Sequence, residues 1–263
     1  MDALATTASL LPSLPVSILL MLAVAAGGIV RGLTGFGAAL LMAPLFSLVM
    51  SPRDTLCLIT LLSVLPLSPR NMRLAWQDMD AGVVRPLTIT AICGLAPGMW
   101  LATRIPGKVF GPIIGFGVMA SALVLMSGIR LPNLRSGRAS AAVGGLSGML
   151  TGFSGVGGPP AILYLASIED DPYRARANFV IFFALLYPVS CALLLLSGLM
   201  SNSVLLSGLL LFPLFHVGGS FGVKLYQNIE KRLLRHLVLA LLLLAGAMAA
   251  LPAILDPASF LSR

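Results

Sequence analysis

The sequence predicts an all-α integral membrane protein built from two inverted-topology repeats, and three observations lead to this prediction. Hydrophobic residues make up 58% and charged residues 10% of the 263 residues, against roughly 45–50% and about 25% in soluble domains. The apolar residues form runs close to the length of about 20 residues that a membrane-spanning helix needs. A glycine-rich segment occurs once in each half of the chain. A soluble globule of this size could neither bury so much apolar surface nor cover its exterior with so few charged residues. This excludes a cytosolic enzyme and a secreted disulfide scaffold.

Apolar runs follow one another along residues 1–263, which we interpret as a single polytopic membrane domain. The candidate runs are 14–30, 33–50, 55–69, 83–103, 109–128, 139–150, 159–168, 177–198, 204–223 and 233–252. The first two are separated only by Arg31-Gly32, and the sixth and seventh are each too short to span a bilayer. We expect each of these pairs to form a broken-helix hairpin, followed in each half by three transmembrane helices.

The two glycine-rich segments are similar to each other. Residues 25–36 read AAGGIVRGLTGF, and residues 142–153 read AVGGLSGMLTGF, with seven identical positions. Chance similarity between two glycine-rich membrane helices is the alternative, but an internal duplication explains the shared Leu-Thr-Gly-Phe run better. We therefore predict repeat 1 over about 14–130 and repeat 2 over about 138–253.

Positive residues predict the orientation of these runs, because cytoplasmic loops carry an excess of Lys and Arg. If each hairpin enters and leaves on one face, twelve such residues lie inside: Arg70, Arg73, Arg85, Arg130, Arg135, Arg138, Arg174, Arg176, Lys224, Lys231, Arg232 and Arg235. Four lie outside, namely Arg53, Arg104, Lys108 and Arg263, and Arg31 lies within the membrane. Each half then crosses an odd number of times, which inverts one half relative to the other. The predicted location is the bacterial inner membrane, with multiple passes.

Two segments of the chain resemble the TauE/SafE family of bacterial membrane transporters, also called sulfite exporters. The matching residues are GIVRGLTGFGAALLMAPLF at 28–46 and GGLSGMLTGFSGVGGPPAILYLA at 144–166. The resemblance covers the whole chain in hydropathy, but only these segments in specific residues. It implies a permease of two homologous halves that moves sulfite or an organosulfonate outward.

The two breaks, predicted at residues 32–37 and 151–158, form the predicted substrate site. A half-helix that begins after a glycine break presents unbonded N–H groups and a positive dipole end, which together attract anions. The residues assigned to this site are Arg31, Thr34, Gly35, Phe36, Gly37, Thr151, Gly152, Phe153, Ser154, Gly155, Gly157 and Gly158. Tight helix packing is the alternative for the glycines, and snorkelling toward the surface is the alternative for Arg31.

The acidic residues indicate the sign of the substrate. All nine fall in or beside predicted loops, so a cationic substrate would lack a counter-charge within the membrane. His216 lies within a predicted span, and histidine is the residue type that most often exchanges protons at physiological pH. It is a candidate for proton coupling, with a simple hydrogen bond to a neighbouring helix as the alternative. A nucleotide-binding loop, a metal-ligand cluster and a nucleophile with its base are missing from the sequence, so we predict no cofactor, no metal and no enzymatic activity.

The predicted function is a secondary transporter, an exporter of a small anion such as sulfite or an organosulfonate, working by alternating access at the bilayer midplane. The alternative is a permease for another solute, either a different oxyanion or a neutral metabolite. The expected partners are a small anionic substrate and the lipid bilayer, with no nucleic acid. The sequence leaves open the exact substrate, the direction, the coupling ion and the oligomeric state, for which a homodimer is one arrangement.

Overall fold

The computed structural model describes residues 14–35, 37–64, 69–127, 135–169, 171–228 and 231–255. In these ranges the chain forms eleven helices and no strands: α2 (Leu14–Thr34), α3 (Ala38–Ser47), α4 (Pro52–Val64), α5 (Pro69–Asp78), α6 (Ala81–Arg104), α7 (Gly107–Ser127), α8 (Gly137–Ser154), α9 (Gly158–Ile168), α10 (Pro172–Leu196), α11 (Asn202–Asn228) and α12 (Lys231–Leu255). Six of them, α2, α6, α7, α10, α11 and α12, hold segments long and apolar enough to cross a membrane. The all-helical architecture with several candidate spans is confirmed for these ranges.

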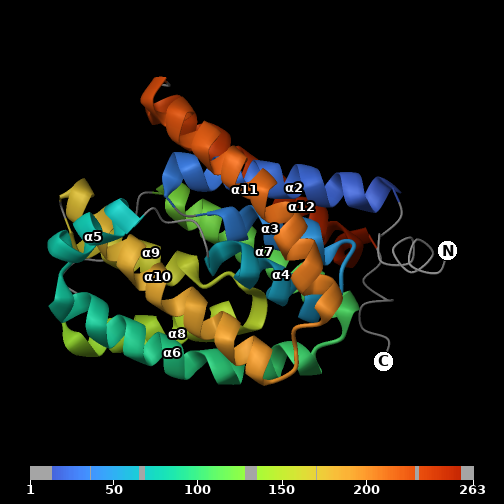
Figure 1. Ribbon diagram of the computed structural model, residues 1–263, viewed down its shortest axis with the longest axis horizontal. Coiled ribbons are helices and arrows are strands. Elements are labelled where there is room, and N and C mark those ends of the chain that lie inside the picture. The colour runs from blue at the N-terminus through green and yellow to red at the C-terminus, as the bar shows by residue number, and fades with distance from the viewer. Residues whose placement is uncertain are drawn as a thin grey trace.

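Two closely packed helix pairs lie along opposite edges of the molecule, with α4 and α10 between them (Figure 1). α2 packs on α11, and α6 packs on α8. Glycines let the backbones of both pairs approach closely, as is common between helices in membranes. A β-carbon at Gly32 of α2 would collide with the Gly219 carbonyl oxygen of α11, and one at Gly148 of α8 would collide with the Ala91 carbonyl oxygen of α6.

The same contacts give the relative directions of the helices. Gly28 lies against Phe215 and Gly32 lies against Gly219, so the contacts advance together and α2 runs parallel to α11. The glycine contacts between α6 and α8 advance in the same way, and these helices are also parallel. α7 also packs on α12, where Gly115 lies against Gly246.

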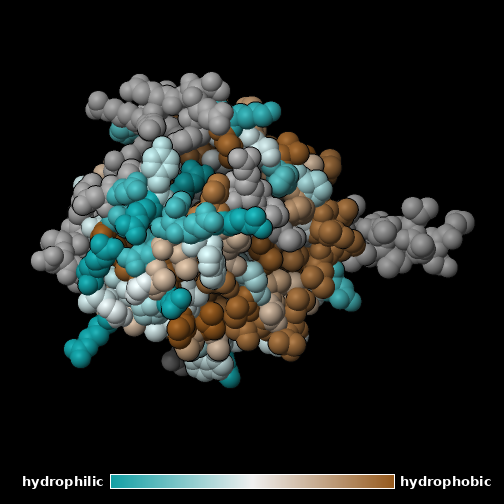
Figure 2. Space-filling view, turned by 60° about the vertical axis from the view of Figure 1, so that its left-hand side comes forward, coloured by the Kyte–Doolittle hydropathy of each residue, from teal (hydrophilic) through white to brown (hydrophobic). Residues whose placement is uncertain are grey.

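The interhelical connections gather at two ends. At one end, the Asp80 backbone N–H donates to Asn178 in α10, and the Asp80 carboxylate accepts a hydrogen bond from Arg135 just before α8. We call this the arginine-rich end, because its exposed residues include Arg73, Arg85, Arg135, Arg138, Arg174 and Arg176. Figure 2, in which this side comes forward, shows hydrophilic residues gathered there and hydrophobic residues along the flank. At the opposite end, Arg53 donates to the backbone carbonyls of Gly198 and Leu199.

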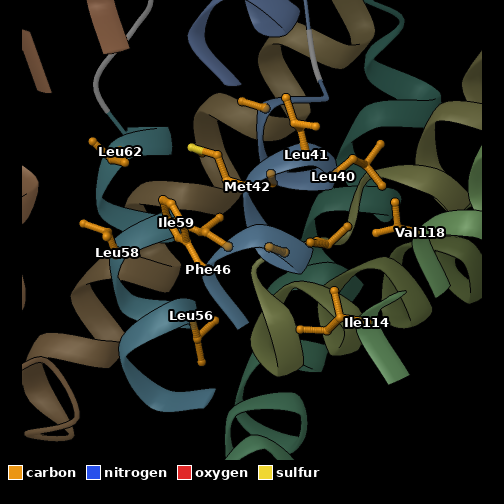
Figure 3. Close-up of a cluster of buried hydrophobic side chains, with 14 of the residues drawn as sticks. Leu40, Leu41, Met42, Phe46, Leu56, Leu58, Ile59, Leu62, Ile114 and Val118 are labelled. Carbon is orange, nitrogen blue, oxygen red and sulfur yellow. The ribbon is translucent and has the colours of Figure 1, made fainter. Parts of the chain in front are cut away.

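The hydrophobic core surrounds the short helix α3. Figure 3 shows where α3, α4 and α7 meet, and the labelled side chains from them are Leu40, Leu41, Met42, Phe46, Leu56, Leu58, Ile59, Leu62, Ile114 and Val118, all buried. Eight of the ten residues of α3 are buried. A helix too short to span a bilayer is tolerated at membrane depth when protein covers it, so α3 can end within the molecule and present its first turn to an internal space.

The two breaks are shorter than the sequence predicts. The prediction placed them from residues 32 and 151 onward, but α2 continues to Thr34 and α8 continues to Ser154. The earlier glycines are helical because they press against α11 or α6, so packing accounts for them. Among the described glycines of the two breaks, Gly35, Gly37 and Gly155 adopt positive φ values, 81°, 93° and 75°, a conformation that glycine reaches without strain.

The predicted span 55–69 also needs correction. α4 begins at Pro52 and ends at Val64, and a separate helix, α5, begins at Pro69. At 13 residues, α4 is about 20 Å long and does not reach across a bilayer alone. Its counterpart in order within the second half, α10, is a continuous helix of 25 residues, so the two halves differ at this point.

Candidate functional site

An internal cavity, which we call the inner cavity, lies between the two breaks. It is lined by Arg31, Gly35, Gly37, Ala38, Ala39, Leu40, Ser63, Val156, Gly158, Ile162, Phe183 and Tyr187. Residues on both sides of the first break and residues of the second break therefore share one space, although they belong to opposite halves of the chain. The space open to the centres of water molecules is about 40 Å³. Because one water needs roughly 10–15 Å³ on that measure, the cavity admits a few waters or one small solute.

Arg31 is the one charged side chain among the described residues that line this cavity. It lies in the last turn of α2, and one guanidinium nitrogen donates to the Ser63 carbonyl oxygen at 3.3 Å. Its guanidinium carbon lies 5.8 Å from the centroid of the Phe215 ring. One carbonyl occupies only part of a guanidinium that has five N–H donors, so Arg31 retains donors for a ligand.

The first turn of α3 adds backbone donors to the same cavity. α3 begins at Ala38, its N-cap Gly37 makes no side-chain capping bond, and its first three residues line the cavity. N–H groups in a first helical turn have no intrahelical acceptor and carry the positive end of the helix dipole. α9 also begins at the cavity, with Gly158, but Pro159 and Pro160 follow and have no N–H to donate. Backbone donation therefore comes mainly from α3.

Three predicted hydroxyl ligands do not line the inner cavity. The side chains of Thr34, Thr151 and Ser154 each donate a hydrogen bond to the carbonyl oxygen four residues earlier in their own helix. A hydroxyl that donates to a carbonyl oxygen of its own helix has no proton left for a ligand, and such bonds often bend the helix slightly. Sequence reasoning counted them as donors because it placed the end of each helix too early.

The second break contains residues with packing roles. Added β-carbons at Gly152, Gly155 and Gly157 would each collide with a neighbouring group, so the packing alternative explains why glycine stands at these positions. Phe153 packs on α7, with 5.3 Å between its ring centroid and that of Phe110. Phe36, also assigned to the site, lies outside the described residues.

Four residues near the breaks were not assigned to the site from the sequence: Ser63, Arg176, Phe183 and Tyr187. The Tyr187 hydroxyl is buried and donates to the Gly155 carbonyl oxygen at 3.2 Å, so it links α10 to the second break. The Phe183 ring stacks on the Tyr187 ring, with a centroid distance of 5.7 Å. Their spacing of four residues on one helix places them on one face, but no pattern in the sequence indicates that this face meets the breaks.

A second cavity, which we call the vestibule, lies beyond Arg31 toward the arginine-rich end. It is lined by Arg31, Gly32, Gly35, Arg176, Val180, Phe215, His216, Gly219, Ser220 and Val223. Arg176 lies in the second turn of α10, and Tyr187 follows eleven residues later, about 16 Å along the helix. Arg176 lies beside the first break and Tyr187 beside the second, so α10 contacts both breaks along its length.

The described carboxylates lie away from both cavities. Asp54, Asp78, Asp80, Glu169 and Asp171 all occupy helix ends or the turns beside them. In the described part of the chain, no ion pair involves Arg31 or Arg176, and no group of three or more potential metal ligands occurs. His216 lines the vestibule, and its ring lies 6.0 Å from that of Phe212 on the same helix. Both cavities are therefore electropositive.

A family model described as sulfite exporter TauE/SafE matches residues 19–249 of the chain. The match includes both breaks and every residue that lines the two cavities. No curated protein and no solved structure matches the chain.

Proposed function

Because the chain belongs to the sulfite exporter TauE/SafE family, we propose that it carries sulfite or a small organosulfonate out of the cell, across the bacterial inner membrane. Family membership and six candidate spans make the protein a membrane transporter. One observation carries the more specific proposal. Arg31 lies between two cavities, without a carboxylate partner in the described residues, so an anion can supply the missing counter-charge.

The donors around the inner cavity suit an oxyanion with three oxygens on one atom. A guanidinium binds two such oxygens through parallel N–H bonds. The first turn of α3 then offers N–H groups to the remaining oxygen. The stacked rings of Phe183 and Tyr187 form an apolar wall, against which the short alkyl group of a sulfonate can lie. A cation would meet Arg31 with no carboxylate to offset it.

The helix directions support alternating access by two inverted repeats, over about 14–130 and about 138–253. α2 runs parallel to α11, and α6 runs parallel to α8. α6 and α10 both begin at the arginine-rich end, where the Asp80 N–H donates to Asn178, and α10 ends at the opposite end, where α11 begins. α6 and α8 therefore oppose α11 and α2. The first helices of the two halves, α2 and α8, then run in opposite directions, as inverted repeats require. Outward movement of an anion also follows the inside-negative potential, which contributes about 2.3 kcal/mol per charge per 100 mV.

The second candidate is a permease for another solute, and Arg31 discriminates among the solutes. A neutral metabolite would leave the guanidinium in the membrane interior without a counter-charge, which is costly. A different oxyanion would satisfy Arg31 equally well. Counterflow measurements with sulfite, methanesulfonate, sulfate and a neutral amide separate these solutes, because only carried solutes exchange with the labelled one.

The proposal is tested by efflux of labelled sulfite from liposomes that contain the purified protein. We expect Arg31→Ala to reduce efflux roughly a hundredfold, as loss of a charge-assisted hydrogen-bond pair implies, and Arg31→Lys to retain part of it. Arg104→Ala is the matched control, because Arg104 is exposed at the end of α6, where it contacts Trp100 and neither cavity. Each variant is first checked for a single symmetrical peak in size-exclusion chromatography. Unchanged sulfite efflux in Arg31→Ala would contradict the proposal.

A further inference from the structure

We propose that the vestibule is a second anion-binding site, in which Arg176 and Ser220 capture the anion at the arginine-rich end and pass it to Arg31. The inference rests on the proposed function in one respect, because the ligand is the same sulfite or sulfonate. It adds a substrate position and a residue, Arg176, that the family match does not assign.

The inner cavity and the vestibule are adjacent. Arg31 and Gly35 line both the inner cavity and the vestibule. The two cavities therefore meet at the Arg31 guanidinium and at the first residue after α2. A ligand in the vestibule reaches the inner cavity by passing one side chain.

The Arg176 side chain lies close to the first break. Its guanidinium atoms lie 3.8–4.0 Å from the point that a β-carbon on Gly35 would occupy. Gly35 has a φ of 81° and no side chain, so the Arg176 head group can lie directly over the break. Arg176 thus extends from the arginine-rich end of α10 to the point where the cavities join.

The vestibule holds two positively charged side chains. Arg31 and Arg176 face the same vestibule, and no carboxylate is among its described lining residues. Two like charges that share a partly enclosed space repel each other, and the repulsion grows as water is excluded. A bound anion between them removes that cost. Ser220 adds a hydroxyl donor and His216 a ring nitrogen at the same cavity.

An anion can reach the vestibule from solvent, because several of its lining residues are exposed. Arg176, His216 and Ser220 are exposed, whereas Arg31 is only half-exposed. Clustered positive charge around Arg176 concentrates anions near the opening. Arg176 therefore binds the anion before Arg31 does when transport starts from this end, and it does not contact an anion that has reached the inner cavity.

The test measures transport separately from each face of the membrane. In liposomes of defined orientation, we expect Arg176→Gln to raise the KM for sulfite about tenfold when sulfite is supplied at the arginine-rich end. The KM measured from the opposite face and the maximal rate should change less than twofold. Arg176→Lys should recover part of the affinity. Arg174→Gln is the matched control, because Arg174 is exposed on the same helix, carries the same charge and lines neither cavity.

A binding measurement keeps the inference testable without transport. Sodium sulfite should raise the Tm of the Arg31→Gln protein, since a ligand bound to the folded state stabilises it. Adding Arg176→Gln should abolish that shift, and adding Arg174→Gln should not. Equal KM changes in Arg174→Gln and Arg176→Gln, or a sulfite-induced Tm shift that survives the loss of Arg176, would overturn the inference. If sulfite binding depends on Arg176 but wild-type protein transports no sulfite, the proposed function fails while the vestibule site stands.

Discussion

The two similar glycine-rich helices, α2 and α8, use aligned residues in opposite ways. Arg31 of α2 aligns with Gly148 of α8. Gly148 presses against α6 so closely that no side chain fits, whereas Arg31 lies between two cavities. Three residues earlier, at Gly28 and the aligned Gly145, the α2 residue is the closely packed one. Gly28 presses against α11, but a β-carbon on Gly145 would meet nothing within 4 Å.

This reversal shows that the two helices turn different faces toward their partners. The buried face is shifted by about one residue, or roughly 100° around the helix axis. In α2 the shift leaves the position of Arg31 facing open space, and in α8 it closes the equivalent space against α6. Similar sequences can therefore pack equally closely on their partner helices and still present different residues to the cavities.

Charge adds a second difference between the pairs. The turn before α6 and the turn before α8 are joined by an ion pair of 2.5 Å between Asp80 and Arg135, with Glu169 4.0 Å from the same guanidinium. In the described part of the chain no ion pair joins α2 to α11. We infer that the α6–α8 pair is the more firmly held of the two.

The largest expected effect tests the packing of α8 on α6. Gly148→Ala places a β-carbon on the Ala91 carbonyl oxygen, so the helices must separate, and we expect a loss of about 3 kcal/mol or failure to fold. Gly145→Ala is the matched control on the same helix. It meets open space and should be neutral or stabilising by roughly 0.5–1 kcal/mol. Thermal unfolding of both detergent-solubilised variants measures the difference. Equal Tm values would contradict the packing difference described above.

A smaller effect is expected where α10 holds the second break. Tyr187→Phe removes the hydrogen bond to the Gly155 carbonyl oxygen and leaves that buried acceptor unpaired, which costs about 1–3 kcal/mol. We expect a lower Tm and a several-fold rise in the KM for sulfite, because the second break lines the inner cavity. Tyr173→Phe is the control, since the Tyr173 side chain is 82% exposed. An unchanged KM in Tyr187→Phe would show that the second break does not position the anion.

The sequence predicted the helical membrane architecture well, because hydropathy and helix length follow directly from the bilayer thickness. It located both breaks within a few residues, since Gly35, Gly37 and Gly155 have positive φ and lie within the predicted segments. It misplaced their beginnings because a glycine inside a packed transmembrane helix and a glycine at a break look alike in sequence. Only the neighbouring helix distinguishes Gly152, which packs on α6, from Gly155.

The candidate site was partly predictable for a related reason. Arg31 is conspicuous as a charge within an apolar run, and the positive-φ glycines beside it mark the first break. Arg176 and Tyr187 are not conspicuous, because an arginine near a helix start is common at a cytoplasmic surface and a tyrosine in a membrane helix is usual. Their roles depend on how α10 packs against segments distant in sequence, which no local pattern encodes.

The smallest expected effect tests the ion pair between Asp80 and Arg135 beside α6 and α8. The hydrogen bond from Arg135 lowers the pKa of the Asp80 carboxyl below its ordinary value, with further support from backbone N–H groups. Ionised Asp80 therefore stabilises the fold at pH values above the ordinary pKa of about 4, and this contribution is lost as the pH falls through the lowered value. Because the Arg135 side chain is 55% exposed, solvent screening limits the contribution to about 1 kcal/mol or less.

Asp80→Asn isolates this contribution, since Asn caps a helix about as well as Asp and Asp80 also caps α6 through the Gly82 N–H. We expect the Tm at pH 7 to fall by a few degrees at most, and the difference from wild type to vanish as the pH falls below about 4. Asp171→Asn is the matched control, because Asp171 caps α10 in the same way and forms no ion pair in the described residues. If both variants give the same Tm change at every pH, the ion pair contributes nothing to holding α6 on α8, and glycine packing alone distinguishes the two helix pairs.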